Sequence, residues 1–85
     1  MLKLSDNIYC EGDDKSQIIV DVSRGKFFEL NTISYDIVNL IIQNKTEKEM
    51  ANFISSKYTV EAEVALHDIK VFIQQLIEMG ILESC

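Results

Sequence analysis

The sequence contains no proline, and its three glycines, two cysteines and single histidine lie far apart from one another. Isolated glycines exclude a glycine-rich phosphate-binding loop. Cys10, His67 and Cys85 fall in three separate segments, so neither a metal site nor a Ser-His-Asp or Cys-His catalytic set is predicted. With no catalytic, metal-ligating or cofactor-binding residue to assign, we expect that this chain is not an enzyme.

Long apolar runs and clusters of basic residues are also missing. No apolar stretch approaches the ~20 residues of a membrane-spanning helix, and the N-terminus lacks the apolar segment of a secretory signal. The net charge of −6 argues against nucleic acid, because that binding depends on basic side chains that neutralise phosphates. We therefore expect a cytoplasmic protein that binds neither membrane nor nucleic acid, with both cysteines as free thiols.

The chain of 85 residues is long enough for one modest hydrophobic core. It has no repeat, low-complexity tract or linker, so residues 1–85 are predicted to form a single domain. A weak strand over residues 7–11, ended by the turn-prone Gly12-Asp13-Asp14, precedes a strong β-branched strand over residues 17–22. A further strand over residues 26–30 is predicted to complete an antiparallel hairpin.

The hydrophobic pattern predicts the register of this hairpin. A three-residue loop, Ser23-Arg24-Gly25, with Gly25 in the left-handed conformation, pairs Val22 with Lys26, Val20 with Phe28 and Ile18 with Leu30. A two-residue loop that pairs Val20 with Glu29 mixes charge into the apolar face, and the three-residue loop is therefore favoured. It predicts a core face and leaves Ile19 and Phe27 on the second face. The predicted core residues are Ile18, Val20, Phe28 and Leu30.

Three helices are predicted to follow the strands, which makes the fold α+β. Asn31 caps the first helix, which ends near residue 43, and Thr46 with Glu49 forms the capping box of the second. The third runs from about residue 61 to residue 79 and ends at Gly80, after which Ile81 and Leu82 fold back onto the core. The apolar positions at helical spacing are Ile33, Ile37, Val38, Leu40, Ile41 and Ile42; Met50, Phe53, Ile54 and Tyr58; and Ala62, Ala65, Leu66, Ile69, Phe72, Ile73, Leu76 and Ile77.

The third helix carries more apolar residues than one core needs. Val64 and Val71 lie outside its apolar stripe and share a face with Asp68 and Gln75, and His67 borders the same face. One interpretation is that both valines are incidental surface residues. The other is that they belong to a binding surface together with the open edge of the hairpin.

The order and spacing of several residues resemble those of one known family. These residues are Asp21, Gly25, Leu30-Asn31, Ile37, Leu40, Thr46, Tyr58-Thr59-Val60, Asp68, Val71-Phe72, Leu76 and Gly80-Ile81-Leu82. They resemble the PqqD-like family, also called RiPP recognition elements, which bind the leader segments of ribosomally made, post-translationally modified peptides. The resemblance covers essentially the whole chain. It implies a winged-helix-like fold, in which a three-stranded antiparallel sheet is followed by three helices.

The resemblance also implies how such a chain binds a peptide. The leader pairs with the edge of the third strand, and its side chains enter a groove between that strand and the third helix. The peptide-binding residues expected on this basis are Lys26, Phe27, Phe28, Glu29, Leu30, Val64, His67, Asp68, Val71, Phe72 and Gln75.

The expected partners are a precursor leader peptide and a separate processing enzyme, with a leader protease favoured over radical-SAM or cyclodehydratase enzymes. Members that act in quinone-cofactor synthesis commonly carry Cys-Asp-Gly before the second helix, where this chain has Gln43-Asn44-Lys45. A freestanding protein of a lasso-peptide pathway is therefore the favoured interpretation.

Two other functions share this predicted topology. A winged-helix DNA-binding regulator requires a basic last helix, but Lys70 is the only basic residue there and several acidic residues surround it. A dimerisation or scaffold module could use the same open edge, since exposed strand edges pair readily with another copy.

Overall fold

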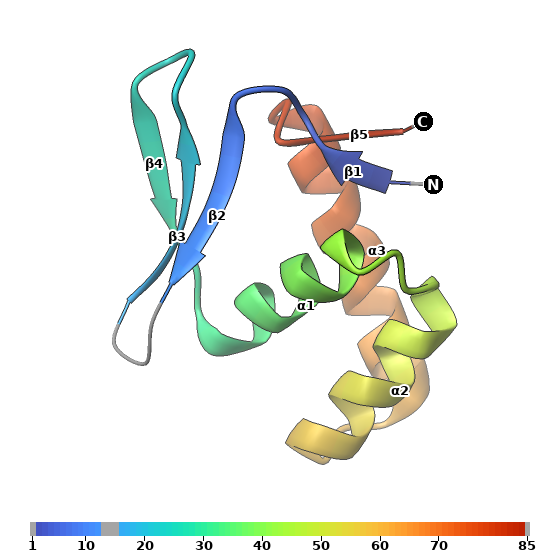
Figure 1. Cartoon of the computed structure of the whole chain (residues 1–85). Helices are drawn as coiled ribbons and strands as arrows, with labels where there is room; N and C mark the ends of the chain where they lie inside the picture. Colours follow the sequence, from blue (N-terminus) through green and yellow to red (C-terminus); the bar gives the residue numbers. More distant parts are fainter. Residues whose placement is uncertain (1, 13–15, 85) are drawn as a thin grey trace.

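The computed structural model describes residues 2–12 and 16–84, and over these residues the chain forms five strands and three helices (Figure 1). This arrangement confirms the predicted α+β class. Asp13 and Asp14 of the predicted turn, and Cys85, lie outside the described residues. The elements in chain order are β1 (Leu2–Leu4), β2 (Ile8–Gly12), β3 (Gln17–Asp21), β4 (Lys26–Glu29), α1 (Thr32–Ile42), α2 (Glu47–Tyr58), α3 (Ala62–Glu78) and β5 (Leu82–Ser84).

The strands form two antiparallel sheets. The larger one has the order β2-β3-β4, and its strands match the predicted ones to within a residue or two at each end. The smaller one pairs β1 with β5, so that Leu2 lies opposite Ser84 and Leu4 opposite Leu82. This pairing was not predicted, and it brings the two ends of the chain side by side (Figure 1).

The predicted register of the hairpin is wrong by one residue. In the structure Ile19 lies opposite Phe28, Val20 opposite Phe27 and Asp21 opposite Lys26. Gly25 has the predicted positive φ of 65°, but the turn spans Val22 to Gly25 and is closed by the Gly25 N–H, which donates to the Val22 carbonyl at 3.4 Å. Since side chains alternate between faces, this single slip exchanges the two faces of β3.

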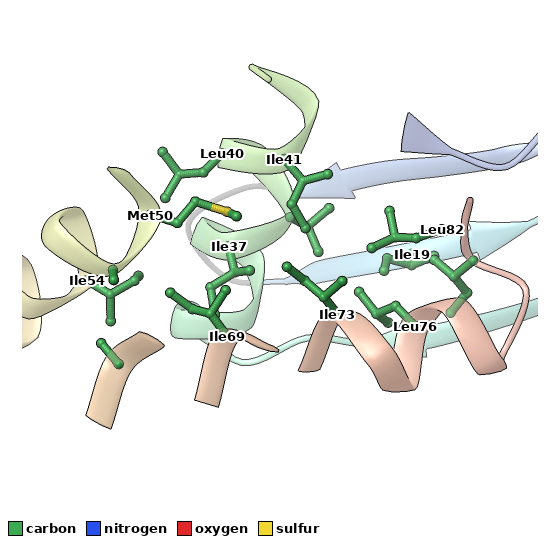
Figure 2. Packing of buried hydrophobic residues seen from close by; sticks show 14 of the residues in the cluster. Ile19, Ile37, Leu40, Ile41, Met50, Ile54, Ile69, Ile73, Leu76 and Leu82 are labelled. Atoms are coloured by element: carbon green, nitrogen blue, oxygen red, sulfur yellow. The ribbon is translucent and has the colours of Figure 1, made fainter. Parts of the chain in front are cut away.

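The slip turns Ile19, rather than Ile18 and Val20, toward the core. Ile19 has no exposed surface and lies among Ile73, Leu76 and Leu82 (Figure 2), whereas Ile18 and Val20 are half-buried on the other face. The physical reason is that Asp21 also faces inward, and its carboxylate is satisfied there by the turn. The Ser23 hydroxyl donates to Asp21 at 2.7 Å and the Arg24 N–H donates at 3.1 Å, so the charge carries no penalty for missing partners.

The helix boundaries and caps agree with the prediction. The Asn31 side chain accepts a hydrogen bond from the Ser34 N–H, and Thr46 and Glu49 exchange both bonds of a capping box. Gly80 has φ 75° just after α3, and Ile81 and Leu82 fold back into the core with at most 2% of their surface exposed. These local signals fix where each helix begins and ends.

The core lies between the helices and the inner face of the larger sheet. Most predicted helix positions are buried, including Ile37, Ile69 and Ile73 (Figure 2). Four apolar residues at the borders of the predicted stripes are instead exposed, because the stripes are wider than the surface that the neighbouring elements cover. They are Ile33, Ile42, Phe53 and Ile77, and the small Ala62 is exposed as well.

A polar contact joins the first two helices. Lys57 forms an ion pair with Asp36 at 2.8 Å, and the Tyr58 hydroxyl donates to the same carboxylate oxygen. Burial, together with the Asp36 carboxylate, raises the pKa of Tyr58, and the hydrogen bond to Asp36 raises the pKa of Lys57. The contact holds α2 against α1.

Candidate functional site

The strand β4 lies at one end of the larger sheet. It pairs with β3 along one side, and no strand within residues 2–12 and 16–84 pairs with its other side (Figure 1). Lys26, Phe27 and Glu29 are exposed on it, and Phe27 keeps 67% of its surface accessible to solvent. The predicted open edge is therefore present.

The hydrogen-bond pattern identifies which backbone groups this edge offers. The Leu30 N–H donates to the Gln17 carbonyl at 2.8 Å, and bonded pairs alternate along an antiparallel ladder. On the other side of β3, the Val22 N–H donates to the Asn7 carbonyl at 3.0 Å. Even-numbered residues of this segment thus bond toward β2 and odd-numbered ones toward β4, which agrees with the Leu30–Gln17 bond. Phe28 therefore turns its N–H and C=O toward β3, while Phe27 and Glu29 turn theirs outward.

The side chains of β4 divide between the two faces of the sheet. Phe28, opposite Ile19, is half-buried against the core, and Leu30 beyond the strand end is also half-buried. Phe27 and Glu29 point to the outer face. A strand added to this edge would consequently place alternate side chains on the core side and on the outer side.

The predicted face of α3 is exposed as expected. Val64 and Val71, one heptad apart, are 50% and 43% exposed, and His67, Asp68 and Gln75 are exposed beside them. Phe72 is half-buried and packs against the core. The sequence therefore predicted the exposure of Val64 and Val71 correctly, whereas Ala62 and Ile77, which were predicted to be buried, are exposed as well.

The two parts of the predicted site, β4 and α3, are connected in two ways: both pack against the same core, and a hydrogen bond joins the hairpin turn to the end of α3. Phe28 and Leu30 pack against the same core as Phe72. At the hairpin turn, Arg24 donates through Nη1 to the Met79 carbonyl at 3.1 Å, which ties the turn to the C-terminal end of α3. Among the described residues, no hydrogen bond or ion pair joins Lys26, Phe27 or Glu29 of β4 to Val64, Asp68 or Gln75 of α3.

Asp21 and Arg24 support the edge, and the prediction did not include them. Asp21 is 3% exposed, and the hydrogen bond from the Ser23 hydroxyl, aided by Arg24, lowers the pKa of its carboxyl group. Arg24 also lies 3.4 Å from Asp21 through its Nε. The sequence did contain a signal, since Asp at the start of a turn commonly accepts a hydrogen bond from a backbone N–H that follows it.

Two hollows of the described surface lie away from this edge and helix face. One of about 610 Å³ is lined by residues of β2, β3 and α1, including Cys10 and Tyr35. Another of about 390 Å³ lies between Leu2, Ile41 and Met50. Burial raises the pKa of the Cys10 thiol, which makes it a poor nucleophile at neutral pH. The candidate site is therefore an open strand edge with an exposed helix face and not an enclosed pocket.

The site offers hydrogen bonds, apolar contacts and a few charges. Among residues 2–12 and 16–84, no three His, Cys, Asp or Glu side chains come close enough to hold a metal ion. Neither does any helix of that part of the chain combine the length and apolar character needed to cross a membrane. What the arrangement can do chemically is to pair with an extended backbone and contact its side chains.

These features define a class of protein: a small α+β domain with an unpaired edge strand and an exposed apolar helix face. The family described as coenzyme PQQ synthesis protein D (PqqD) matches residues 16–82. The chain therefore belongs to the PqqD family, which confirms the resemblance seen in the sequence. A comparison with curated proteins found no match.

Two similar solved structures contain a bound peptide. One is a lasso peptide synthetase B1 complexed with the leader peptide, which is 25% identical, with a TM-score of 0.90 over 98% of each chain. The other is TbiB1 in complex with the TbiA(beta) leader peptide, which is 23% identical, with a TM-score of 0.87 over 98% of this chain and 96% of that one. At 23% identity the second likeness shows the fold alone.

Proposed function

We propose that this chain, acting as one domain over residues 1–85, binds the leader segment of a ribosomally made precursor peptide. The observation that carries the proposal is the outward direction of the Phe27 and Glu29 backbone groups on an unpaired edge. An added strand forms main-chain hydrogen bonds with these groups, which give affinity without dependence on sequence. The similar lasso synthetase B1 was solved with its leader peptide, which supports this occupant.

Selectivity would come from the alternate side chains of the leader. A residue opposite Phe28 lies on the core side of the added strand, toward α3, where we assign Val64, His67, Asp68, Val71, Phe72 and Gln75 to the site. Residues opposite Phe27 and Glu29 lie on the outer side. A segment with an apolar residue opposite Phe28 gains most, because half-buried Phe28 and Phe72 leave apolar surface to cover.

The chain delivers the bound precursor to a separate processing enzyme in the cytoplasm. A leader-cleaving protease of a lasso-peptide pathway is the favoured partner, ahead of radical-SAM or cyclodehydratase enzymes. Two observations support this choice: the likeness to lasso peptide synthetase B1, and Gln43-Asn44-Lys45 in place of the Cys-Asp-Gly of quinone-cofactor members. A DNA-binding regulator is disfavoured, because the one lysine of α3, Lys70, lies 4.0 Å from Glu47.

Titration of a fluorescent leader peptide, taken from the precursor encoded beside this chain, tests the proposal. Wild-type protein should bind, and Val71→Asp should bind at least about tenfold more weakly, because an apolar contact becomes an unpaired charge. Val60→Asp makes the same change at an exposed position outside the site and should bind normally. Equal affinity of Val71→Asp and wild type, with both folded, would remove this helix face from the site.

The strand-addition step has its own test. Glu29→Pro removes an outward N–H but no bond to β3, whereas Glu29→Ala removes only the side chain. The proposal requires that the proline variant loses leader affinity and that the alanine variant largely keeps it. Identical binding by both variants would show that the leader does not pair with β4.

A further inference from the structure

The outer face of the larger sheet carries a row of apolar side chains, two of which are largely exposed. Tyr9, Val20 and Phe27 lie directly opposite one another on β2, β3 and β4. Tyr9 is 54% exposed and Phe27 is 67% exposed, while the helices pack against the inner face at Ile19 (Figure 2). Val22, the first residue of the turn that follows β3, is a further exposed apolar residue. We call this surface, together with its neighbouring row described next, the outer face.

The neighbouring row on the same face is acidic at both ends. Glu11, Ile18 and Glu29 lie opposite one another, and neither glutamate forms an ion pair with another residue of the described chain. Among the paired residues of β2, β3 and β4, Lys26 is the one basic residue. It lies opposite Asp21 in the strand ladder, so its side chain is on the inner face and not on the outer face. Within residues 2–12 and 16–84, the outer face therefore has an apolar row beside a row that ends in a glutamate without an ion pair on each side.

This charge pattern selects among possible occupants. A second copy of the chain would bring like charges together, since each copy carries a net charge of −6 and presents the same two glutamates. An anionic membrane surface is disfavoured for the same reason. A protein surface with an apolar centre and a basic border is complementary to it, and exposed aromatic residues such as Tyr9 and Phe27 are typical of such interfaces.

We propose that the outer face docks a separate protein that presents an apolar surface bordered by Lys and Arg. The outer face is continuous with the β4 edge through Phe27, whose backbone lies on the edge and whose side chain lies on the face. A protein docked there is held beside any segment paired with β4. The inference that a protein docks on the outer face does not depend on the proposed function. Only the identity of that protein does: if the chain binds a leader peptide, the docked protein is the leader-processing enzyme.

Photo-crosslinking in the source cells identifies the occupant. A photoreactive residue is introduced as Tyr9→p-benzoylphenylalanine, with Phe53→p-benzoylphenylalanine on α2 as the matched control, since both aromatic rings are about half exposed. We expect one discrete crosslinked protein from position 9, absent from position 53, with Lys or Arg near the linked residue. The identified protein is then purified and titrated against wild type, Tyr9→Ser and Glu11→Lys.

Both variants should bind the purified partner about tenfold more weakly, and their leader affinity should stay within about twofold of wild type. Tyr9 and Glu11 lie on β2, and β3 separates them from β4. The leader-affinity measurement therefore reports on a site separate from the two substitutions. No crosslink at position 9, a crosslink to a second copy, equal crosslinks at both positions, or unchanged partner affinity would each overturn the inference. A wild-type chain that fails to bind leader would refute the proposed function and leave this result standing.

Discussion

The two faces of the larger sheet are made of alternate residues of the same three strands, yet they have opposite surroundings. On the inner face Ile8, Ile19 and Asp21 are buried, and on the outer face Tyr9 and Phe27 are more than half exposed. The difference shows that only one face of the sheet is needed to build the core, although both faces carry apolar residues. One face is used for folding, and the other face, with the β4 edge, remains available for binding.

The largest expected effect comes from the inner face. Ile19→Ala removes a side chain with no exposed surface and should lower the free energy of unfolding by about 2–5 kcal/mol. Val20→Ala, its half-buried neighbour on the outer face, serves as the control and should cost about 1 kcal/mol or less. Urea denaturation measures both, and equal losses would contradict the assignment of the two faces.

A smaller effect is expected at the buried charge of the inner face. The pKa of Asp21 is lowered in the folded protein by the Ser23 hydroxyl and Arg24, so its ionised form stabilises the fold at pH values above the usual carboxyl pKa. This contribution is lost as the pH falls through the lowered folded-state pKa. Asp21→Asn should therefore be less stable than wild type at neutral pH, by less than Ile19→Ala.

Thermal unfolding of wild type and Asp21→Asn between pH 7 and pH 2 measures this difference. It should shrink as the solution becomes acidic. The pKa of Glu49 is also lowered, by the hydrogen bond from the Thr46 backbone N–H. Because Glu49 is present in both proteins, its titration cancels in the difference between them. A difference in stability that is the same at every pH would mean that the Asp21 charge does not stabilise the turn.

Loss of the Thr46 cap is expected to cost about 1 kcal/mol, without any effect on either face of the sheet. Thr46→Ala removes the hydroxyl that accepts from the Glu49 N–H at 3.1 Å at the start of α2. The variant should unfold earlier in urea but bind leader with unchanged affinity. A loss of leader affinity in the folded variant would show that the binding surface depends on α2.

The smallest effect on stability is expected for a substitution on the outer face. The same substitution should have its larger effect on leader binding. Phe27→Ser removes an exposed side chain, so the free energy of unfolding should change by only about 0.5 kcal/mol. Leader affinity, measured by fluorescence titration, should fall because the outer side of the added strand loses its apolar neighbour. A strongly destabilised variant would instead place Phe27 in the core.

Much of the fold follows from local signals in the sequence. Asn31, the Thr46–Glu49 capping box and Gly80 each mark a helix end through contacts within a few residues, and all were predicted correctly. The β1–β5 pairing was missed because it joins three-residue strands from opposite ends of the chain. No local pattern distinguishes such short strands from coil.

The hairpin register was missed for a different reason. The prediction kept Asp21 out of the core because a buried charge is costly, but the turn supplies its hydrogen-bond partners. At the candidate site, the exposure of Val64 and Val71 was predicted correctly from their positions outside the apolar stripe of the third helix. Phe27 is exposed on the second face as predicted, but Ile19, which the predicted register placed on the same face, is buried. The outward direction of the Phe27 and Glu29 backbone groups depends on the register and could come only from the structure.

Amide hydrogen exchange of β4, measured by NMR with and without the leader peptide, tests the strand-addition account most directly. Bound peptide should slow exchange strongly at the Phe27 and Glu29 amides, which face outward, and change it little at Phe28, which already donates toward β3. Saturating peptide that leaves the exchange of Phe27 and Glu29 as fast as in the free protein would contradict the account.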